Sequence, residues 1–334
     1  MSAHPDSEVP VANRLDVDRG PAVGNLDVRW IHGHPAGRPD RDPPIQVHAF
    51  DAHTFILRQS KTVHAEAPFL YLLCGNDRAL LLDTGATEDF GRFPLRATVD
   101  GLIAGWLQAH PRQGYQLVVA HSHAHADHVA ADAQFAGRPD TTIVPAALDP
   151  MRAFWGLDEW PDGVATLDLG GRRLEIVGCP GHHETAIAVF DPWSGFLLTG
   201  DTVYPGRLFV ADEAAFAASL DRLVDFAASR PVTHLMGGHV EMTRRPGHDH
   251  PMGALHQPDE PPLQMAPRQL SDVRDALASI AGRRGVHRFA GFIIVNRPGL
   301  PAMVGMIGRA LWHRLARWRP PRRRSVGSRP RGGS

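Results

Sequence analysis

Cysteine is scarce in this sequence of 334 residues, which contains only Cys74 and Cys179. Two thiols cannot form the disulfide framework of a small secreted domain, and their scarcity favours a reducing compartment. The first 30 residues contain acids and prolines but no apolar core of a signal peptide. No stretch is long and apolar enough to span a bilayer. These absences predict a cytoplasmic protein.

The net charge is also close to zero. The sequence has 35 basic and 36 acidic residues, and its formal charge at pH 7 is −1. This balance argues against attraction of the whole chain to nucleic acid or to anionic membranes. Hydrophobic residues make up 43% and charged residues 21%, which are ordinary values for a globular protein. A chain of this length also provides ample material for a large core.

Histidine is concentrated in residues 121–128, which read His-Ser-His-Ala-His-Ala-Asp-His. Four imidazoles and a carboxylate within eight residues offer ligands suited to zinc or iron. Side chains two residues apart at the exit of a strand point the same way. His123 and His125 can therefore bind one ion, while Asp127 and His128 turn towards a second.

Short apolar segments predict strands, and longer segments with apolar residues at helical spacing predict helices. The predicted helices are residues 95–110 and 213–229, with a short Ala-rich helix at 129–135. The predicted strands are residues 53–58, 69–73, 79–83, 116–120, 141–144, 173–177, 186–190 and 195–198. Strands grouped with intervening helices indicate a layered α/β fold.

The pattern His-x-His-x-Asp-His resembles the metal-binding motif of the metallo-β-lactamase fold superfamily. Four further motifs resemble the other elements of that family in the family's order. They are Leu80-Leu81-Leu82-Asp83-Thr84-Gly85, Cys179-Pro180-Gly181-His182, Leu197-Leu198-Thr199-Gly200-Asp201 and Gly237-Gly238-His239. The resemblance covers roughly residues 46 to 245, and it implies an α/β fold of the αββα sandwich type with a metal site at one edge of the sheets.

The resemblance also implies a set of seven metal ligands: His123, His125, Asp127, His128, His182, Asp201 and His239. Two zinc ions are expected, with iron or manganese as alternatives, and Asp201 is expected to bridge them. His121 is interpreted as a neighbour, because only the motif register that starts at His123 places Asp127 and His128 correctly. Asp83 is expected to hold a ligating imidazole in place.

These ligands predict a binuclear zinc hydrolase that acts on a small-molecule substrate. Metal binding lowers the pKa of water towards about 7, so hydroxide is available at neutral pH to attack an acyl carbon or phosphorus. The resemblance suggests that Asp127 orients the nucleophile and helps to move protons. Tyr204 matches the position of a tyrosine of acyl-homoserine lactonases that hydrogen-bonds the substrate carbonyl, and a packing role is the alternative.

The acidic residue at position 201 resembles the glyoxalase II, lactonase and phosphodiesterase branches, so cleavage of a thioester or lactone is favoured over β-lactam hydrolysis. Phosphodiester hydrolysis stays open. A mononuclear iron persulfide dioxygenase, which would use His123, His182 and Asp201, is a second alternative. A binding module without catalysis is a third, although the full ligand set argues against it.

The chain divides into three predicted parts. Residues 1–44 are rich in Pro, Gly and Asp and predict a flexible extension, and residues 45–297 predict the catalytic domain. Within that domain the Pro- and His-rich loop 241–266 is expected either to cover the mouth of the site or to be an ordinary surface loop. Four side chains are candidates for lining the pocket, with a core position as the alternative: His64, Trp155, Trp160 and Phe209.

Residues 298–334 predict a basic amphipathic helix and an Arg-rich tail. A terminal helix docked on the domain is favoured for this part. Weak contact with an anionic membrane surface is the alternative, and nucleic acid is not an expected partner of the protein. The pattern predicts no particular oligomeric state.

Overall fold

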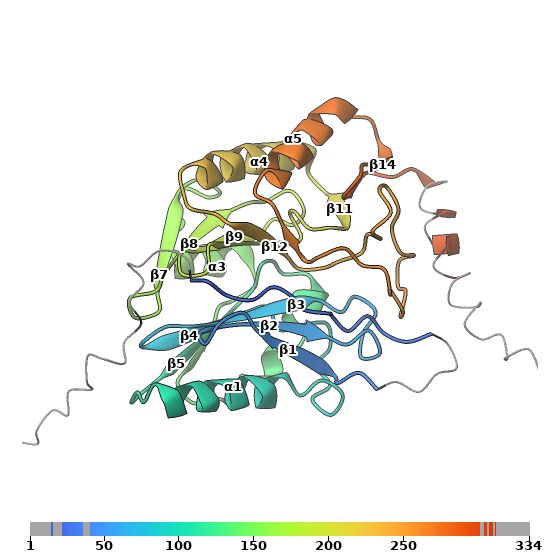
Figure 1. Ribbon diagram of the computed structural model, residues 1–334. Coiled ribbons are helices and arrows are strands. Elements are labelled where there is room, and N and C mark those ends of the chain that lie inside the picture. Colours follow the sequence, from blue (N-terminus) through green and yellow to red (C-terminus); the bar gives the residue numbers. More distant parts are fainter. Residues whose placement is uncertain are drawn as a thin grey trace, which may run out of the picture.

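The protein is described by a computed structural model, which covers residue 15 and residues 22–35, 41–300, 304–305, 307–309 and 311. Within these residues two six-stranded sheets lie face to face, and helices cover both outer faces (Figure 1). The expected αββα sandwich is confirmed. All eight predicted strands and the two long helices are present, within two residues of their predicted ends.

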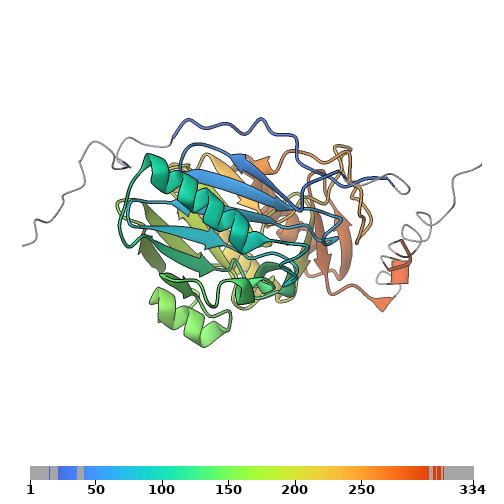
Figure 2. The same ribbon diagram turned by 90° about the horizontal axis from the view of Figure 1, so that it is seen from below.

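The first sheet has the strand order β1-β2-β3-β4-β5-β6. Its strands are β1 (Ile45–Ala49), β2 (Thr54–Gln59), β3 (Phe69–Cys74), β4 (Arg78–Leu82), β5 (Gln116–Ala120) and β6 (Thr141–Ile143). Helix α1 (Leu95–Ala109) covers its outer face and buries an apolar stripe there (Figure 2). Strands β4 and β5 are parallel, so the segments that follow them leave the sheet at the same edge.

The second sheet has the strand order β13-β12-β10-β9-β8-β7. Its strands are β7 (Val164–Asp168), β8 (Arg173–Gly178), β9 (Ile187–Asp191), β10 (Phe196–Gly200), β12 (His234–Gly237) and β13 (Gln264–Met265). Helices α4 (Glu213–Ala228) and α5 (Gln269–Ile280) cover its outer face. Strands β10 and β12 are parallel, so the residues after them also share one edge.

A third, three-stranded sheet has the order β11-β15-β14, formed by β11 (Arg207–Val210), β15 (Ile293–Asn296) and β14 (Gly285–Arg288). Helix α3 (Leu148–Trp155) lies against β7. The main core lies between the two large sheets, and every residue of β3, β9 and β10 is buried. Burial on both faces explains why these strands read as continuous apolar runs.

The prediction of a helix at 129–135 is wrong. Helix α2 (Ala126–Val129) begins three residues earlier, and only one 3-10 turn (Asp132–Gln134) follows. The carbonyl of His128 accepts a hydrogen bond from the backbone N–H of Thr84, and the N–H of Ala130 donates to the carbonyl of Gly85. These backbone groups are therefore bonded to another turn of the chain, so a helix cannot continue through them.

The flexible extension predicted for residues 1–44 is wrong for residues 22–35. The ring of Trp30 packs edge-on against Phe69 with 4.9 Å between centroids, and Ile31 N donates to Gln46 Oε1 at 2.6 Å. Partial burial of this tryptophan against the core, together with the hydrogen bond to Gln46, orders the segment on the sandwich. Most of residues 1–21 and of the Arg-rich tail lies outside the described residues.

In the described part of the chain, no helix combines the length and the apolar character needed to cross a bilayer. Cys74 and Cys179 are both buried and free. Burial raises the pKa of each thiol to about 12, so both are protonated at neutral pH.

Candidate metal centre

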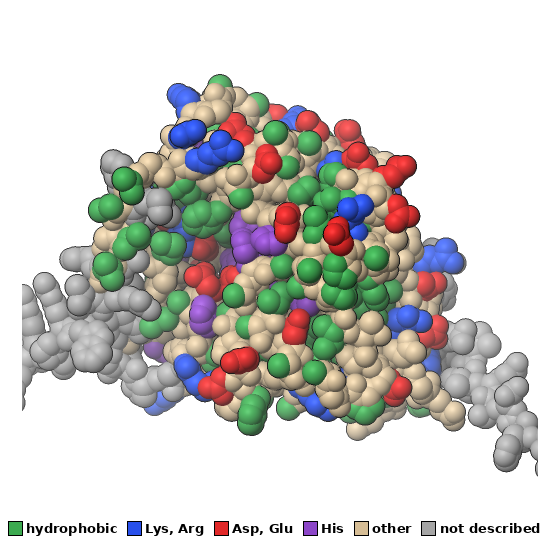
Figure 3. All heavy atoms as spheres, turned by 180° about the vertical axis from the view of Figure 1, so that it is seen from behind, with side chains coloured by type: hydrophobic (Ala, Val, Ile, Leu, Met, Phe, Trp, Pro, Cys, Tyr) green, Lys and Arg blue, Asp and Glu red, His purple; other side chains and the backbone are tan. Residues whose placement is uncertain are grey.

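The seven predicted ligands come together at one edge of the sandwich. Four of them follow β5, Asp201 follows β10, and His239 follows β12. His182 lies in the loop between β8 and β9. The parallel pairs bring these strand ends to the same edge, where histidine side chains gather in a hollow of the surface (Figure 3).

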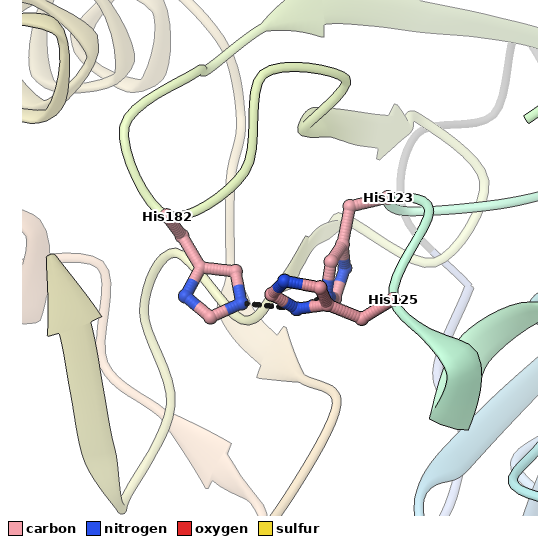
Figure 4. Close-up of side chains that lie close together, drawn as sticks. All are labelled: His123, His125 and His182. Atoms are coloured by element: carbon pink, nitrogen blue, oxygen red, sulfur yellow. Dashed lines mark hydrogen bonds between the residues drawn. The ribbon is translucent and has the colours of Figure 1, made fainter. Parts of the chain in front are cut away.

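His123, His125 and His182 form the first group of ligand atoms, with their rings lying edge to face (Figure 4). Nδ1 of His125 lies 2.9 Å from Nε2 of His123 and 3.0 Å from Nε2 of His182. Burial, together with the neighbouring imidazoles, lowers the pKa of His125 to about 4 and that of His123 well below its ordinary value. Both rings are therefore neutral at pH 7, as metal ligands must be.

Asp127, His128 and His239 form a second group. Nε2 of His239 lies 3.3 Å from Oδ2 of Asp127 and 3.3 Å from Nε2 of His128. Asp201 stands between the groups, because its Oδ1 lies 3.5 Å from His239 and its Oδ2 lies 3.8 Å from His182. This is the arrangement that a bridging carboxylate requires.

The second group is electrostatically prepared for a cation. Burial opposes ionisation of Asp201, but His239 and His128 lower its pKa to about 2. Burial also lowers the pKa of His239, but Asp201 and Asp127 outweigh this effect and raise it to about 9. The carboxylates are thus ionised at pH 7 and attract either protons or a metal ion to the two imidazoles.

Neighbouring acceptors orient three of the imidazoles. Nδ1 of His128 donates to Oδ2 of Asp83 at 2.9 Å, as expected for Asp83. Nδ1 of His182 donates to the carbonyl of Phe209 at 2.9 Å, and Nδ1 of His239 donates to the carbonyl of Glu66 at 3.1 Å. Since a carbonyl or carboxylate oxygen can only accept, Nδ1 carries a proton, and Nε2 is the atom of each ring that would bind a metal ion in the site.

Two observations show that these residues fit a divalent ion. Oδ1 of Asp201 is buried and has no hydrogen-bond partner among the described residues, and a buried carboxylate oxygen without a partner is costly. A Cβ atom at Gly238 would lie 2.6 Å from this oxygen and 3.0 Å from Cε1 of His128. Glycine therefore keeps the space beside Asp201 and His128 open. The assignment of the seven residues as ligands stays a prediction.

Two nearby residues lie outside the ligand groups. Nε2 of His121 is 2.8 Å from Oδ1 of Asp132, so this imidazole is engaged elsewhere, in agreement with its interpretation as a neighbour. Tyr204 is 3% exposed, and its hydroxyl donates to the carbonyl of Arg207 at 2.6 Å. A catalytic role for Tyr204, which stays a prediction, would require the hydroxyl to leave this carbonyl.

A pocket of about 540 Å³ opens over the ligands. It is lined by Glu66, His125, Asp127, His182, Asp201, Tyr204, Phe209, Val210, Ala211, His239, Glu241, Val295, Arg297 and Pro298. Of the four pocket candidates only Phe209 lines it, since Trp155 and Trp160 contribute to the core and His64 is exposed. From the loop 241–266 only Glu241 reaches it, so the loop does not cover the mouth.

Sequence reasoning missed the wall formed by residues 295–298 and by Glu66. The wall residues stand more than 50 positions after His239, and no motif marks them. Parallel pairing of β15 with β11 brings them to the site, because Val295 and Asn296 lie beside Phe209 and Val210. A prediction of that pairing would have been the only route to them.

A family model described as the Metallo-beta-lactamase superfamily matches residues 66–259. A hydroxyacylglutathione hydrolase of Anaeromyxobacter dehalogenans is 28% identical over 246 residues, which are 71% of this chain and 85% of that protein. One of Aeromonas hydrophila is 36% identical over 106 residues, 30% of this chain, and the match spans only 40% of that protein. A solved metallo-beta-lactamase of Pontibacter korlensis aligns with a TM-score of 0.47 and 16% identity, over 70% of this chain and 99% of that one. The chain belongs to the metallo-beta-lactamase superfamily.

Proposed function

We propose that this protein is a metal-dependent hydrolase that cleaves an ester-type bond, with a thioester as its preferred substrate. The observation that carries the proposal is the pair of ligand groups with Asp201 between them. Two relatives at modest identity are hydroxyacylglutathione hydrolases, a name that denotes thioester cleavage. Their similarity supports a thioester over a lactone or a phosphodiester.

Two ions of zinc are the proposed cofactor. His123, His125 and His182 would hold one ion, and the second group, Asp127, His128 and His239, would hold the other, with Asp201 shared. Imidazole-rich donor sets of this kind suit zinc. Such ions supply hydroxide at neutral pH and positive charge for a developing oxyanion.

Asp127 is the proposed proton-handling residue of the chain. Its carboxylate lines the pocket and is 23% exposed, whereas Asp201 is nearly buried. Burial opposes ionisation, but a hydrogen bond with His239 and the charge of His128 hold the pKa of Asp127 well below its usual range. Asp127 is thus an ionised acceptor that can orient a water molecule in the pocket and guide its proton towards the leaving group.

The pocket supports a substrate with an apolar part and an anionic part. Phe209, Val210 and Val295 form an apolar wall. Arg297, beside Pro298 on the same wall, is the one arginine or lysine among the lining residues that the structure describes. An arginine in this position favours a carboxylate, so we propose an acyl thioester whose thiol or acyl part carries one.

Metal analysis combined with a substrate panel tests this function. We expect about two zinc ions per chain in protein purified without added metal, and faster hydrolysis of S-lactoylglutathione than of lactones or phosphodiesters. About one iron per chain, with oxygen uptake on glutathione persulfide, would instead support the dioxygenase alternative. Protein that folds but hydrolyses none of the panel would contradict the proposed activity.

A further inference from the structure

The last 35 residues of the chain, numbers 300–334, differ in charge from everything before them. This C-terminal segment contains nine of the 35 basic residues and none of the 36 acidic ones. The rest of the chain therefore carries a net negative charge, although the whole is close to neutral. Such an uneven distribution of charge indicates that the segment interacts with a negatively charged partner of its own.

The described part of the segment is helical and turns an apolar face outward. Residues 304–305, 307–309 and 311 have helical conformation. Side chains at helical spacing are strongly exposed: Leu300 by 78%, Val304 by 65%, Ile307 by 46% and Leu311 by 52%. Spacings of four, three and four residues place these side chains on one face of a helix.

The polar face of this helix is the one that contacts the body of the protein. Nη2 of Arg309 lies 3.1 Å from Oδ1 of Asp249, whose carboxylate also bonds Arg288 at 2.9 Å and Arg207 at 3.0 Å. Arg309 follows Ile307 by two residues and Val304 by five, so it projects from the side opposite the apolar stripe. Figure 1 shows the helical fragments beside the sandwich, at the end of the chain that follows β15.

This orientation is the reverse of a helix packed on its own domain. A docked amphipathic helix buries its apolar stripe and exposes its charges. Here the stripe is exposed and an arginine is bonded to a nearly buried carboxylate, since the Asp249 side chain is only 6% exposed. The described side chains therefore do not show the packed apolar face of the docked helix that the sequence favours, and the exposed stripe is available to an apolar partner.

We propose that the C-terminal segment binds an anionic lipid surface. The apolar stripe enters the boundary between headgroups and acyl chains, while the arginines of the segment contact anionic headgroups. The sequence beyond the described helix fits this arrangement, because Leu315 and Trp318 continue the apolar spacing among arginines. Arg297 and Pro298, which line the pocket, directly precede the segment, so the lipid surface lies near the pocket mouth.

The same observations argue against two other partners. Nucleic acid would engage the arginines but would leave the apolar stripe in water. A second copy of this chain would cover the stripe but would bring two sets of nine arginines together without any acidic residue in either segment. A lipid surface satisfies both the charge and the stripe.

Vesicle co-sedimentation of the full-length protein tests the proposal. We expect binding to phosphatidylcholine vesicles that contain about 30% phosphatidylglycerol, little binding to pure phosphatidylcholine, and weakening with salt. The double variant Ile307→Asp/Leu311→Asp should lower the partition coefficient by roughly tenfold or more. The control is Phe90→Asp, which alters an exposed apolar side chain (77% exposed) outside the segment and should bind as the wild type does.

The proposal would be overturned by wild-type protein that does not bind anionic vesicles or by an equal loss of binding in the Phe90 control. A dimer, detected by light scattering, that dissociates only in the double variant would overturn it as well. Duplex DNA binding that survives the double variant, without vesicle binding, would also overturn it. Thermal unfolding and hydrolysis of a water-soluble thioester check folding. Both should be unchanged in the double variant, since Ile307 and Leu311 do not line the pocket.

Discussion

Asp83 holds His128 through a hydrogen bond of 2.9 Å while its own backbone lies in the left-handed region, with φ at 69°. The same carboxylate accepts hydrogen bonds from the backbone N–H of Ser122 at 2.6 Å and from its hydroxyl at 2.9 Å. Left-handed backbone is unfavourable for a residue other than glycine, and such strain is concentrated at functional sites. We therefore infer that Asp83 positions the second ligand group.

Replacing Asp83 by Asn tests that role. An amide has one acceptor oxygen where the carboxylate has two, so the variant side chain cannot accept from both Ser122 N–H and His128 Nδ1–H, and the His128 ring is held less firmly in its tautomer and orientation. We expect roughly 10- to 100-fold weaker binding of one zinc ion, with the other retained. Zinc titration against a chelating dye measures both affinities. Equal weakening of both ions, or of neither, would contradict the selective effect.

The histidine run offers a matched pair of variants. His123→Ala removes a predicted ligand and should lower the zinc content and reduce kcat by at least about 100-fold. His121→Ala removes an imidazole from the same run that is bonded to Asp132, and it should keep both ions. Metal content and thioester hydrolysis measured side by side decide between the two motif registers. Full activity of the His123 variant would overturn the assignment.

Tyr204→Phe distinguishes packing from catalysis. Because the hydroxyl donates to the carbonyl of Arg207, its removal leaves a buried carbonyl with one bond fewer and should lower the free energy of unfolding by about 1 kcal/mol. We expect kcat to change by less than about threefold. A fall in kcat of about 100-fold at unchanged stability would support the catalytic role that the sequence predicts.

Arg297 should determine preference for anionic substrates. Arg297→Ala is expected to raise KM about five- to tenfold for a thioester that carries a carboxylate and to leave KM for a neutral thioester unchanged. Arg297→Lys keeps the charge and should recover part of the loss. Equal effects on both substrates would mean that Arg297 shapes the pocket without recognising charge.

His53 should make stability depend on pH. Burial lowers its pKa to about 4, although Asp51 opposes the shift, and Nδ1 accepts a hydrogen bond from Trp106 at 2.9 Å. Between about 6.5 and 4 the unfolded chain binds this proton and the folded chain does not, so stability falls as pH falls through that window.

The variant His53→Asn has no titrating imidazole but can still accept the hydrogen bond from Trp106. It should reduce the loss of stability between pH 6.5 and 4 by about 1 kcal/mol, a modest value because His53 is partly exposed. Urea unfolding at several pH values measures the slope for both proteins. Identical slopes would show that His53 does not contribute.

The sequence alone was sufficient for the parts of the protein that depend on local pattern. Continuous apolar runs predicted the central strands, because burial on both faces allows few polar side chains. The ligand residues could be named because their short motifs resemble, in order, those of the metallo-β-lactamase fold superfamily. Parallel pairing of β10 with β12 brings Asp201 close to His239 within one sheet, and the packing of the two sheets then brings both residues to the ligands that follow β5.

Only the tertiary structure decided how the site is supported and enclosed. The carbonyls of Glu66 and Phe209 that orient His239 and His182 belong to the backbone, which every residue type has, so no pattern marks them. The pocket wall around Arg297 depends on β15 pairing with β11 across more than 80 residues of chain. The docking of Trp30 on Phe69 and the outward face of the C-terminal helix are likewise long-range outcomes. Each of these outcomes depends on which surfaces the folded sandwich leaves exposed. A local stretch of sequence does not specify those surfaces.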